Sequence, residues 1–375
     1  MSLGILSTYP PTQCGLATFS RALVESLQTG GDEVGVVRLV DADELPSVVG
    51  HAWVRGTRGG AEAAAAALDG YDVAVIQHEY GIFPGRDGEE VLSVVRALRV
   101  PVITVLHTVL VTPSDHQREI LLELARYSDV LVTMTETARQ RLVAHYAIDP
   151  AQVEVIPHGA AQFSADRGSS ARGRAGRAPV ILTWGLLGEG KGIEWAIDAM
   201  RELADLRPRP EYWVVGETHP KVRAQHGEAY RDQLIERAGD DLGRAVHFDD
   251  HYLTTAELHQ RIHRADVVLL PYDSREQVTS GVLIEAVTAG KPVISTGFPH
   301  AVELLASGAG LIVERRDPAS IAAALRRVLT DPALAARMTA EATRIAPDLL
   351  WPAVGDRYRQ IARRATAIGA VRASA

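Results

Sequence analysis

The sequence predicts an α/β protein built from two doubly wound domains in tandem. Short runs of β-branched and aliphatic residues alternate with amphipathic segments of about 10–15 residues, a pattern typical of a parallel sheet with helices on both faces. The alternation stops in residues 164–178, which are rich in Gly, Ser and Arg, and then restarts. Because 375 residues also exceed an ordinary single core, we expect one domain over residues 1–165 and a second over 179–349, with a linker at 164–178.

In the first domain, the expected strands are short apolar runs at residues 3–6, 34–37, 73–76, 102–106, 130–134 and 153–156. A helix after the first strand places Phe19, Leu23 and Leu27 on one face at four-residue spacing. Further helices are expected at residues 61–68, 89–98, 117–126 and 136–146. Residues 41–70 carry little pattern apart from the alanine-rich helix within them.

In the second domain, strands are expected at residues 180–184, 212–215, 246–248, 267–270, 293–294 and 311–313. One helix carries Ile193, Ile197 and Met200 along a single face. Other helices are expected at residues 230–237, 254–262, 318–329, 332–345 and 352–366. A further helix begins at Thr279-Ser280-Gly281, because Ser and Thr are favoured at helix N-termini.

Composition excludes several classes of protein. The formal net charge of −8 argues against general nucleic-acid binding, which requires clustered Lys and Arg. Cys14 is the single cysteine, so no intrachain disulfide can form and a reducing compartment fits. The N-terminus lacks the features of a signal peptide, and no apolar run approaches the roughly 20 residues that cross a bilayer. We therefore expect a soluble, cytoplasmic protein.

The motifs of several other enzyme classes are missing from the sequence. One cysteine cannot make a thiolate cluster, and no HExxH pattern occurs among the histidines, so no metal site is predicted. No GxSxG nucleophile elbow and no Walker GxxxxGK[ST] pattern is present, since Gly192 follows Lys191. The first strand does not lead into GxGxxG, which weakens a dinucleotide-binding interpretation.

Ligands of doubly wound folds bind at the carboxyl ends of the strands, so polar residues that directly follow strands are the candidates for a site. In the first domain these residues are Gln13, Cys14, Gly15, Gln77, His78, Glu79, Tyr80, Gly81, His107 and Thr108. Such residues also serve as ordinary caps and loop residues. For His107 we favour a functional role because of its position at the end of a central strand.

In the second domain, the candidates lie in three segments, residues 185–192, 216–219 and 272–285. Lys191 lies between two glycines just before a helix, where its ammonium group can meet a diphosphate beside backbone amides. The helix that begins at Ser280 offers free amides and a positive dipole end, which together favour an anion. An ordinary strand-to-helix turn is the alternative interpretation of each segment.

These motifs resemble those of the retaining, nucleotide-sugar-dependent glycosyltransferases of the GT-B fold, specifically glycosyltransferase family 4, over nearly the whole chain. Residues 188–192 resemble the family's glycine-lysine-glycine donor loop, and residues 277–296 resemble its E-x7-E region and the helix behind it. In the first domain, residues 11–15 resemble the glycine-containing loop near the acceptor and donor, and His107 matches a histidine that reaches the donor sugar. Residues 155–159 resemble the segment that leads to the interdomain hinge.

The resemblance implies a GT-B architecture, in which two Rossmann-like domains face each other across a cleft. A C-terminal helix, here residues 350–366 with Trp351 near its start, is expected to cross back onto the first domain. It implies transfer of a hexose, with mannose or glucose favoured, from GDP-mannose or a UDP-hexose to a saccharide or glycolipid acceptor. No cofactor or metal is expected, because protein cations and helix dipoles replace the metal. Membrane association is not favoured, since residues 117–146 carry mixed charge.

The resemblance also implies a role for each candidate residue. His107, Lys191, Gln277 and Glu285 would be catalytic, with Lys191 stabilising the charge on the leaving diphosphate and Glu285 accepting hydrogen bonds from the ribose hydroxyls. The residues expected to bind the donor or its nucleotide are Gly15, Gly188, Gly190, Lys191, Gly216, His251, Tyr252, Thr279, Ser280, Gly281, Val282, Leu283 and Glu285. The residues expected on the acceptor side are Gln13, Cys14, His78, Glu79 and Tyr80. The family has no agreed protein nucleophile, and none is predicted.

Two departures from the family pattern keep other functions open. Gln277 stands where the first acid of E-x7-E is expected, with Glu276 one residue out of register, and Leu186 stands where a phosphate-binding Arg is common. Arg275 is a candidate replacement for that cation. The alternatives are a catalytically silent nucleotide-sugar-binding partner, a sugar-nucleotide epimerase or phosphorylase of the same fold, and a periplasmic-type binding module.

Overall fold

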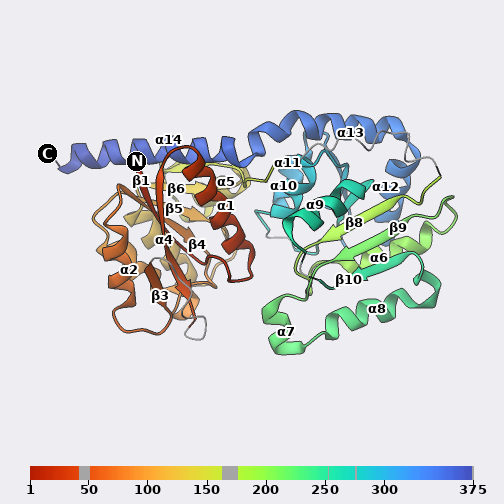
Figure 1. Ribbon diagram of the computed structural model, residues 1–375, viewed down its shortest axis with the longest axis horizontal. Helices are drawn as coiled ribbons and strands as arrows, with labels where there is room; N and C mark the ends of the chain where they lie inside the picture. Colours follow the sequence, from red (N-terminus) through yellow and green to blue (C-terminus); the bar gives the residue numbers. More distant parts are fainter. Residues whose placement is uncertain (42–50, 163–175, 252, 275–276, 374–375) are drawn as a thin grey trace. The chain divides into compact units, whose positions relative to one another are not determined.

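The computed structural model describes residues 1–41, 51–162, 176–251, 253–274 and 277–373 (Figure 1). The chain forms two compact units: unit 1 comprises Met1–Ala161 with Leu349–Ala375, and unit 2 comprises Gln162–Asp348. Each unit is built on one parallel sheet, so the predicted doubly wound α/β fold is confirmed. Most of the predicted linker at 164–178 lies outside the described residues.

Unit 1 contains a seven-stranded sheet in the order β3-β2-β1-β4-β5-β6-β7. The strands are β1 (Ser2–Ser7), β2 (Glu33–Val40), β3 (His51–Val54), β4 (Val73–His78), β5 (Val102–Leu106), β6 (Val130–Thr133) and β7 (Val153–Val155). The helices are α1 (Gly15–Thr29), α2 (Gly60–Leu68), α3 (Val91–Ala97), α4 (Asp115–Tyr127), α5 (Glu136–Tyr146) and α14 (Trp351–Ala373). Strand order reverses between β1 and β4, which is the switch point where ligands of such sheets bind.

The strands of unit 1 are apolar on both faces, so two cores form. Leu3 and Ile5 of β1 pack with α1 and with the Val354, Tyr358 and Ile361 side chains of α14. Leu6, the next residue after Ile5, points to the opposite face and packs with helices α2, α3 and α4. The period-2 alternation of a strand therefore assigns α1 and α14 to one face and α2, α3 and α4 to the other.

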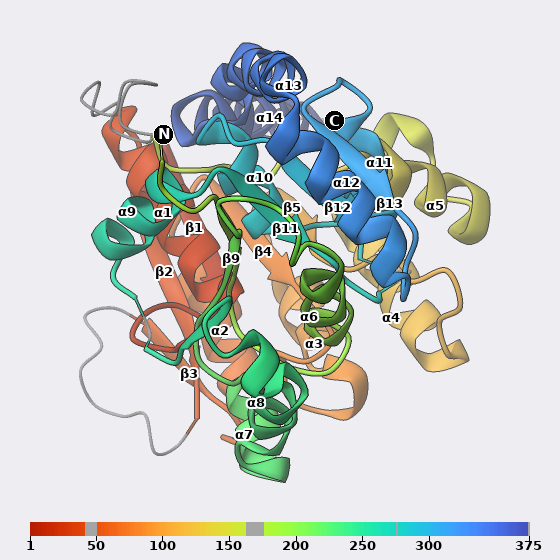
Figure 2. The same ribbon diagram turned by 90° about the vertical axis from the view of Figure 1, so that its right-hand side faces the viewer.

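Unit 2 contains a six-stranded sheet in the order β10-β9-β8-β11-β12-β13, of which Figure 2 shows β11, β12 and β13 side by side. Its strands are β8 (Val180–Trp184), β9 (Glu211–Val215), β10 (Val246–Asp249), β11 (Val267–Leu270), β12 (Val293–Thr296) and β13 (Gly310–Val313). Its helices are α6 (Ile193–Glu202), α7 (Pro220–His226), α8 (Ala229–Leu242), α9 (Thr255–Arg264), α10 (Gly281–Thr288), α11 (Pro299–Leu305), α12 (Pro318–Thr330) and α13 (Pro332–Ile345). Here the order reverses between β8 and β11.

Strand β3 and helices α7 and α11 are absent from the sequence-based prediction. β3 is a four-residue edge strand in which only Trp53 is buried, so it has no apolar run. The short helices α7 and α11 both begin at a proline, Pro220 and Pro299, which suits the first turn of a helix but not its interior. Across the described residues, no helix combines the length and hydropathy that a membrane span requires.

Candidate functional site

The candidate site of unit 2 is centred on Gly185, which directly follows β8. Its amide donates to the Val215 carbonyl over 3.0 Å, and its φ of 118° is one that favours glycine. A Cβ atom placed on Gly216 would lie 2.2 Å from the Gly185 carbonyl oxygen, and one placed on Gly185 would lie 3.6 Å from Val282. The ends of β8 and β9 and the first turn of α10 therefore meet at this glycine, at the β8/β11 switch point.

The loop that carries Lys191 is tied to the segment after β11. The Gly190 carbonyl accepts a hydrogen bond from the Asp273 amide at 2.9 Å. A Cβ atom on Gly192, whose φ is 67°, would lie 1.8 Å from the Pro271 carbonyl oxygen, so only glycine allows this approach. The half-buried Lys191 places its Nζ 4.4 Å from the ring centroid of Tyr272. Gly188, also in this loop, is buried against Val222.

Helix α10 begins beside this loop with an ordered cap. The Ser280 hydroxyl accepts from the Leu283 amide at 3.3 Å, and the Ser280 amide donates to Nδ1 of His300 at 2.9 Å. The amides of Gly281 and Val282 also lie in the first turn, where helix geometry provides no intrahelical acceptor, so both can donate to a ligand. This end of α10 is a pair of backbone donors at the positive end of a helix dipole, which favours an anion.

Glu285 lies one turn further along α10 and points toward β8. Its Oε2 accepts a hydrogen bond from the indole Nε1 of Trp184 at 3.0 Å. Burial raises the pKa of the Glu285 carboxyl, and the Trp184 hydrogen bond opposes that shift by favouring the ionised form. The second oxygen, Oε1, is the one left to accept a donor from a ligand.

Other predicted residues of unit 2 lie around this centre. The Gln277 side-chain amide donates to the Thr279 carbonyl at 3.0 Å, so it holds the turn before Ser280. The Gly216 amide donates to the Asp249 carbonyl at 2.8 Å, and His251 follows, exposed, with Nδ1 3.0 Å from Asp249 Oδ1. That carboxylate raises the pKa of His251. Tyr252, Arg275 and Glu276 lie outside the described residues.

The candidate site of unit 1 contains three histidines: His78 is the last residue of β4, and His107 and His158 follow β5 and β7. Nε2 of His107 lies 2.7 Å from Oε1 of Gln77, and the Phe19 ring contacts His107 and His158 at centroid distances of 4.9 and 5.0 Å. Burial lowers the pKa of His78 to about 4, of His107 to about 3 and of His158 to about 4. These imidazoles are therefore neutral near pH 7.

His78 differs from the other predicted acceptor-side residues because it is completely buried. Its ring lies 4.9 Å from Tyr80 and 6.3 Å from Phe83, and among the described residues neither ring nitrogen has a hydrogen-bond partner. A side chain with no exposed surface cannot touch an acceptor. In this structure His78 packs inside unit 1, and the sequence did not reveal this because it stands at the polar end of its strand.

Glu79 and Tyr80 shape the loop after β4. Oε2 of Glu79 accepts from the Thr108 hydroxyl at 2.5 Å, and its Oε1 accepts from the Tyr80 amide at 3.0 Å. The Tyr80 hydroxyl donates to the Gln117 carbonyl at 3.2 Å, and burial raises the pKa of this phenol. The loop is thus joined to the segment after β5 and to α4, which fixes the Glu79 carboxylate at the β1/β4 switch point.

The loop after β1 ends in a cysteine cap. Sγ of Cys14 accepts from the Ala17 amide at 3.3 Å and lies 3.3 Å from the Thr8 hydroxyl. Gln13 and Gly15 are exposed, and a Cβ atom on Gly15 would meet no atom within 4 Å. The loop therefore leaves open space at the start of α1.

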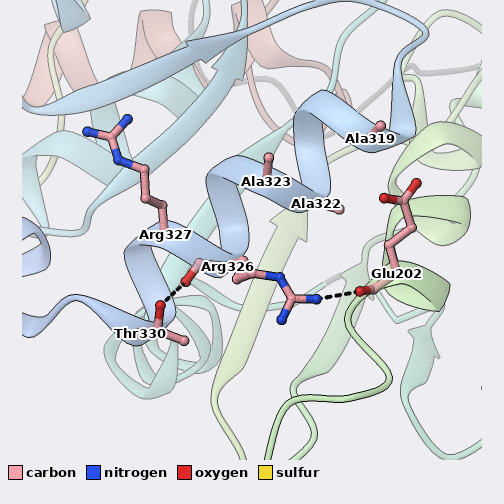
Figure 3. A pocket seen from close by; sticks show the side chains of 7 residues that line it. All are labelled: Glu202, Ala319, Ala322, Ala323, Arg326, Arg327 and Thr330. Carbon is pink, nitrogen blue, oxygen red and sulfur yellow. Dashed lines mark hydrogen bonds between the residues drawn. The ribbon is translucent and has the colours of Figure 1, made fainter.

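Two other features of unit 2 lie apart from the predicted residues of the Gly185 centre. Asp249, Asp250 and His251 have the spacing of a metal ligand set, but Asp249 is paired with Arg261 at 2.6 Å, so part of its charge is already neutralised. A hollow of about 360 Å³ lies between α6 and α12 (Figure 3). Its Arg326 is bound by Asp205 and the Glu202 carbonyl, and the rest of the wall is largely alanine.

Trp184 and Phe19 contribute to the two centres but were not predicted as site residues, and Tyr272 was predicted only as part of the candidate segment 272–285. Trp184 and Phe19 lie within elements that sequence analysis treats as apolar strand or helix face, and their contacts with Glu285 and His107 cross between distant segments. An aromatic residue at the last position of a strand, as Trp184 is, was the available signal.

Two family models match the chain. The model described as Glycosyltransferase Family 4 matches residues 14–161, and that described as Glycosyl transferases group 1 matches residues 178–331. Together they cover about four fifths of the chain, one in each unit.

Curated relatives include glycogen synthase of Mycobacterium tuberculosis, 31% identical over 242 residues (64% of this chain and 55% of that protein). D-inositol 3-phosphate glycosyltransferase of Kineococcus radiotolerans is 33% identical over 260 residues (64% of this chain and 58% of that protein). The chain thus spans a little over half the length of these relatives.

Solved structures match over almost the whole chain. Sucrose-phosphate synthase of Thermosynechococcus elongatus superposes with a TM-score of 0.78 at 17% identity, covering 98% of this chain and 100% of that chain. Anabaena HepE in complex with UDP-glucose superposes with a TM-score of 0.75 at 17% identity, covering 96% and 98%. These similarities establish the GT-B fold. The two family models, one in each unit, show that the chain belongs to the group 1 and family 4 glycosyltransferases.

Proposed function

We propose that this chain is a retaining hexosyltransferase that moves glucose or mannose from a nucleotide diphosphate sugar to a saccharide or glycolipid acceptor. The observation that carries the proposal is the centre at Gly185, where one cation, free helix amides and a carboxylate surround a switch point. A nucleotide diphosphate needs a cation and amides for its phosphates and a carboxylate for its ribose, and these groups provide them.

In this proposal, Lys191 and the amides of Gly281 and Val282 hold the diphosphate. As the glycosidic bond breaks, negative charge grows on the leaving phosphate, and fixed donors stabilise that charge without reorganisation. No metal is assigned to the reaction, because the ammonium group and the helix end supply the positive charge. Glu285 accepts from a ribose hydroxyl through the oxygen that Trp184 leaves free.

Unit 1 supplies neutral hydrogen-bonding groups in this proposal. A neutral imidazole can donate with one nitrogen and accept with the other, which suits the hydroxyl groups of a sugar. Nε2 of His107 is hydrogen-bonded to Gln77, so Nδ1 points away from Gln77 and can form a hydrogen bond with the donor sugar. Glu79 and the open end of α1 at Gly15 are the acceptor-side groups with exposed surface nearby.

The donor is a UDP-hexose or GDP-mannose in this proposal. The solved relative from Anabaena contains UDP-glucose, which makes UDP the first nucleotide to test. A second candidate function is a catalytically silent nucleotide-sugar-binding partner. It is favoured by Gln277, whose amide is directed to the Thr279 carbonyl, and by Leu186 where the family often has a second cation.

Thermal stabilisation by UDP, GDP and ADP, without added metal, tests the proposal in wild type and Lys191→Ala. A ligand that binds only the folded state raises stability by RT ln(1 + [L]/Kd). We expect a shift with one nucleotide that is lost or strongly reduced in the variant. Release of nucleotide from its sugar donor then separates the two candidates, since a silent partner binds without turnover. No shift with any nucleotide contradicts both.

A further inference from the structure

Lys191 rests on an aromatic ring rather than on a carboxylate. Its Nζ lies 4.4 Å from the ring centroid of Tyr272, within the range of a cation–π interaction. Asp273, the neighbouring acid, is occupied by Arg316, whose Nε lies 2.7 Å from Oδ2. Within the part of the chain that the structure describes, no carboxylate lies at ion-pair distance from Lys191. We infer that Tyr272 is a positioning residue, which holds the Lys191 ammonium ready for the diphosphate of the donor.

The Tyr272 ring is itself rigidly held. It is 1% exposed and stacks on Phe298 at a centroid distance of 5.3 Å and an angle of 21°. Its carbonyl accepts from the Thr296 hydroxyl at 2.5 Å, which joins the backbone to β12. A ring fixed by a neighbouring ring and by a strand is a stable surface for a flexible side chain.

The loop and the ring also share one backbone support. The Gly190 carbonyl is bonded to the Asp273 amide, and Gly192 contacts the Pro271 carbonyl, so the residues on both sides of Lys191 contact the residues on both sides of Tyr272. The backbone that carries the ammonium group is therefore tied directly to the backbone that carries the ring. Neither contact involves the donor ligand, so the arrangement exists before binding.

An aromatic support suits this task better than an acid. A lysine side chain loses about 2 kcal/mol of rotamer freedom when it is fixed, and a preorganised ammonium loses part of that before the ligand arrives. A carboxylate partner would have to be displaced by the diphosphate. The face of a ring attracts the cation without consuming its N–H donors, so all three remain for phosphate oxygens.

The Tyr272 hydroxyl has no part in this role. It is buried, and among the described residues it has no hydrogen-bond partner. Tyr272→Phe keeps the ring and removes only an unpaired hydroxyl, which costs little. Tyr272→Leu keeps a large apolar side chain and removes the ring face. The two variants therefore separate the ring from the hydroxyl.

The inference rests on the proposed function, and a double-mutant cycle tests it. Binding of UDP, GDP and ADP, and separately of UMP, GMP and AMP, is measured by calorimetry. The proteins compared are wild type, Tyr272→Phe, Tyr272→Leu, Lys191→Ala and Tyr272→Leu/Lys191→Ala. We expect Tyr272→Leu to weaken binding of the nucleoside diphosphate roughly three- to tenfold and binding of the corresponding monophosphate less. Tyr272→Phe should bind both like wild type. Once Lys191 is gone, Tyr272→Leu should have no further effect.

Three results would overturn the inference. Tyr272→Leu could weaken diphosphate and monophosphate binding equally, or weaken diphosphate binding just as much in the Lys191→Ala background. It could also tighten diphosphate binding, which would mean that the ring competes with phosphate. Leu325→Ala is the control, since Leu325 is fully buried in the core of unit 2. It should lower stability and leave the preference for diphosphate unchanged. If Lys191→Ala binds like wild type, or wild type binds no nucleotide, the proposed function fails as well. A normal Lys191 effect without coupling removes only the role of Tyr272.

Discussion

The two switch points of this protein have the same topology and opposite chemistry. At β8/β11, glycines bring backbones together, and Lys191 and free helix amides make the site electropositive. At β1/β4, the groups are side chains, and the buried histidines are neutral. In the proposed function, this difference suits the site of unit 2 to the diphosphate and the neutral imidazoles of unit 1 to sugar hydroxyl groups. The difference arises from a few residues at strand ends, because sheet order alone gives both units the same crevice position.

Gly192, in the Lys191 loop of unit 2, should matter far more than Gly15, at the start of α1 in unit 1. Gly192→Ala adds a Cβ atom 1.8 Å from the Pro271 carbonyl at a left-handed φ of 67°, whereas Gly15→Ala meets no atom within 4 Å. Left-handed strain alone costs about 1–2 kcal/mol, and the overlap adds to it. We expect Gly192→Ala to lower the free energy of unfolding by more than about 2 kcal/mol and to abolish nucleotide binding, with Gly15→Ala near wild type in urea unfolding. Equal effects would contradict the comparison.

Acid should weaken unit 1 before unit 2. The pKa values of His78, His107 and His158 are about 4, 3 and 4 in the folded state, against about 6.5 in the unfolded chain. The unfolded chain therefore binds more protons below about pH 6.5, and stability falls as pH falls from there towards 4. The raised pKa of Glu285 acts in the opposite sense, since the folded state then takes up its proton at higher pH than the unfolded chain does.

Hydrogen exchange at several pH values measures this directly. Amides of α1, β4 and β5 should lose protection on acidification while those of β8 and β11 retain it. His78→Phe, which places an untitratable ring beside Tyr80 and Phe83, should flatten the pH dependence in unit 1. Loss of protection first in unit 2, or an unchanged slope in the variant, would show that the histidines do not control acid stability.

Two carboxylates sharpen the comparison further. Glu285→Gln removes a charge that burial disfavours, so the variant should be as stable as wild type or more stable above about pH 5. It should bind the nucleotide roughly tenfold more weakly, because a charged acceptor is lost. Glu79→Gln in unit 1 should instead lose stability, since Glu79 accepts from Thr108 and the Tyr80 amide. Thermal unfolding with and without nucleotide distinguishes the two responses.

Trp184→Phe should give the smallest effect. It removes one hydrogen bond to Glu285 and keeps an aromatic ring, so we expect a loss of about 0.5–1.5 kcal/mol in the free energy of nucleotide binding. The loss should be smaller when the ligand is a 2′,3′-dideoxynucleotide, which has no ribose hydroxyl that could donate a hydrogen bond to Glu285. A loss of equal size for both ligands would indicate a packing effect of Trp184 alone. Calorimetry with the two nucleotides makes the comparison.

Regular elements were predictable from the sequence because their signals are local. The predicted ranges 102–106, 136–146, 180–184 and 332–345 coincide with β5, α5, β8 and α13, and Ser280 and Thr254 cap α10 and α9 where their residue types indicate. β3 was missed because its pairing with β2 depends on a neighbour rather than on its own pattern. The positions of site loops followed from strand ends, and their roles remain proposals.

Contacts between distant segments could not be predicted in the same way. Burial of His78 depends on Tyr80 and Phe83 closing over it, and the Trp184–Glu285 hydrogen bond joins residues 101 apart in sequence. No periodicity records which side chain of one strand faces which side chain of a later helix. For the same reason, the ring beneath Lys191 emerged only from the fold.

The return of α14 to unit 1 has a consequence for synthesis. One core of unit 1 is closed by Val354, Tyr358, Ile361, Ala362 and Ala365 of α14, whereas all its other buried residues precede Ala161. At about 5–20 residues per second, the ribosome needs roughly ten to forty seconds more to make the intervening chain. During that time Leu23 and Leu27 of α1 lack their final cover. Unit 2 can therefore finish folding first, although unit 1 begins first.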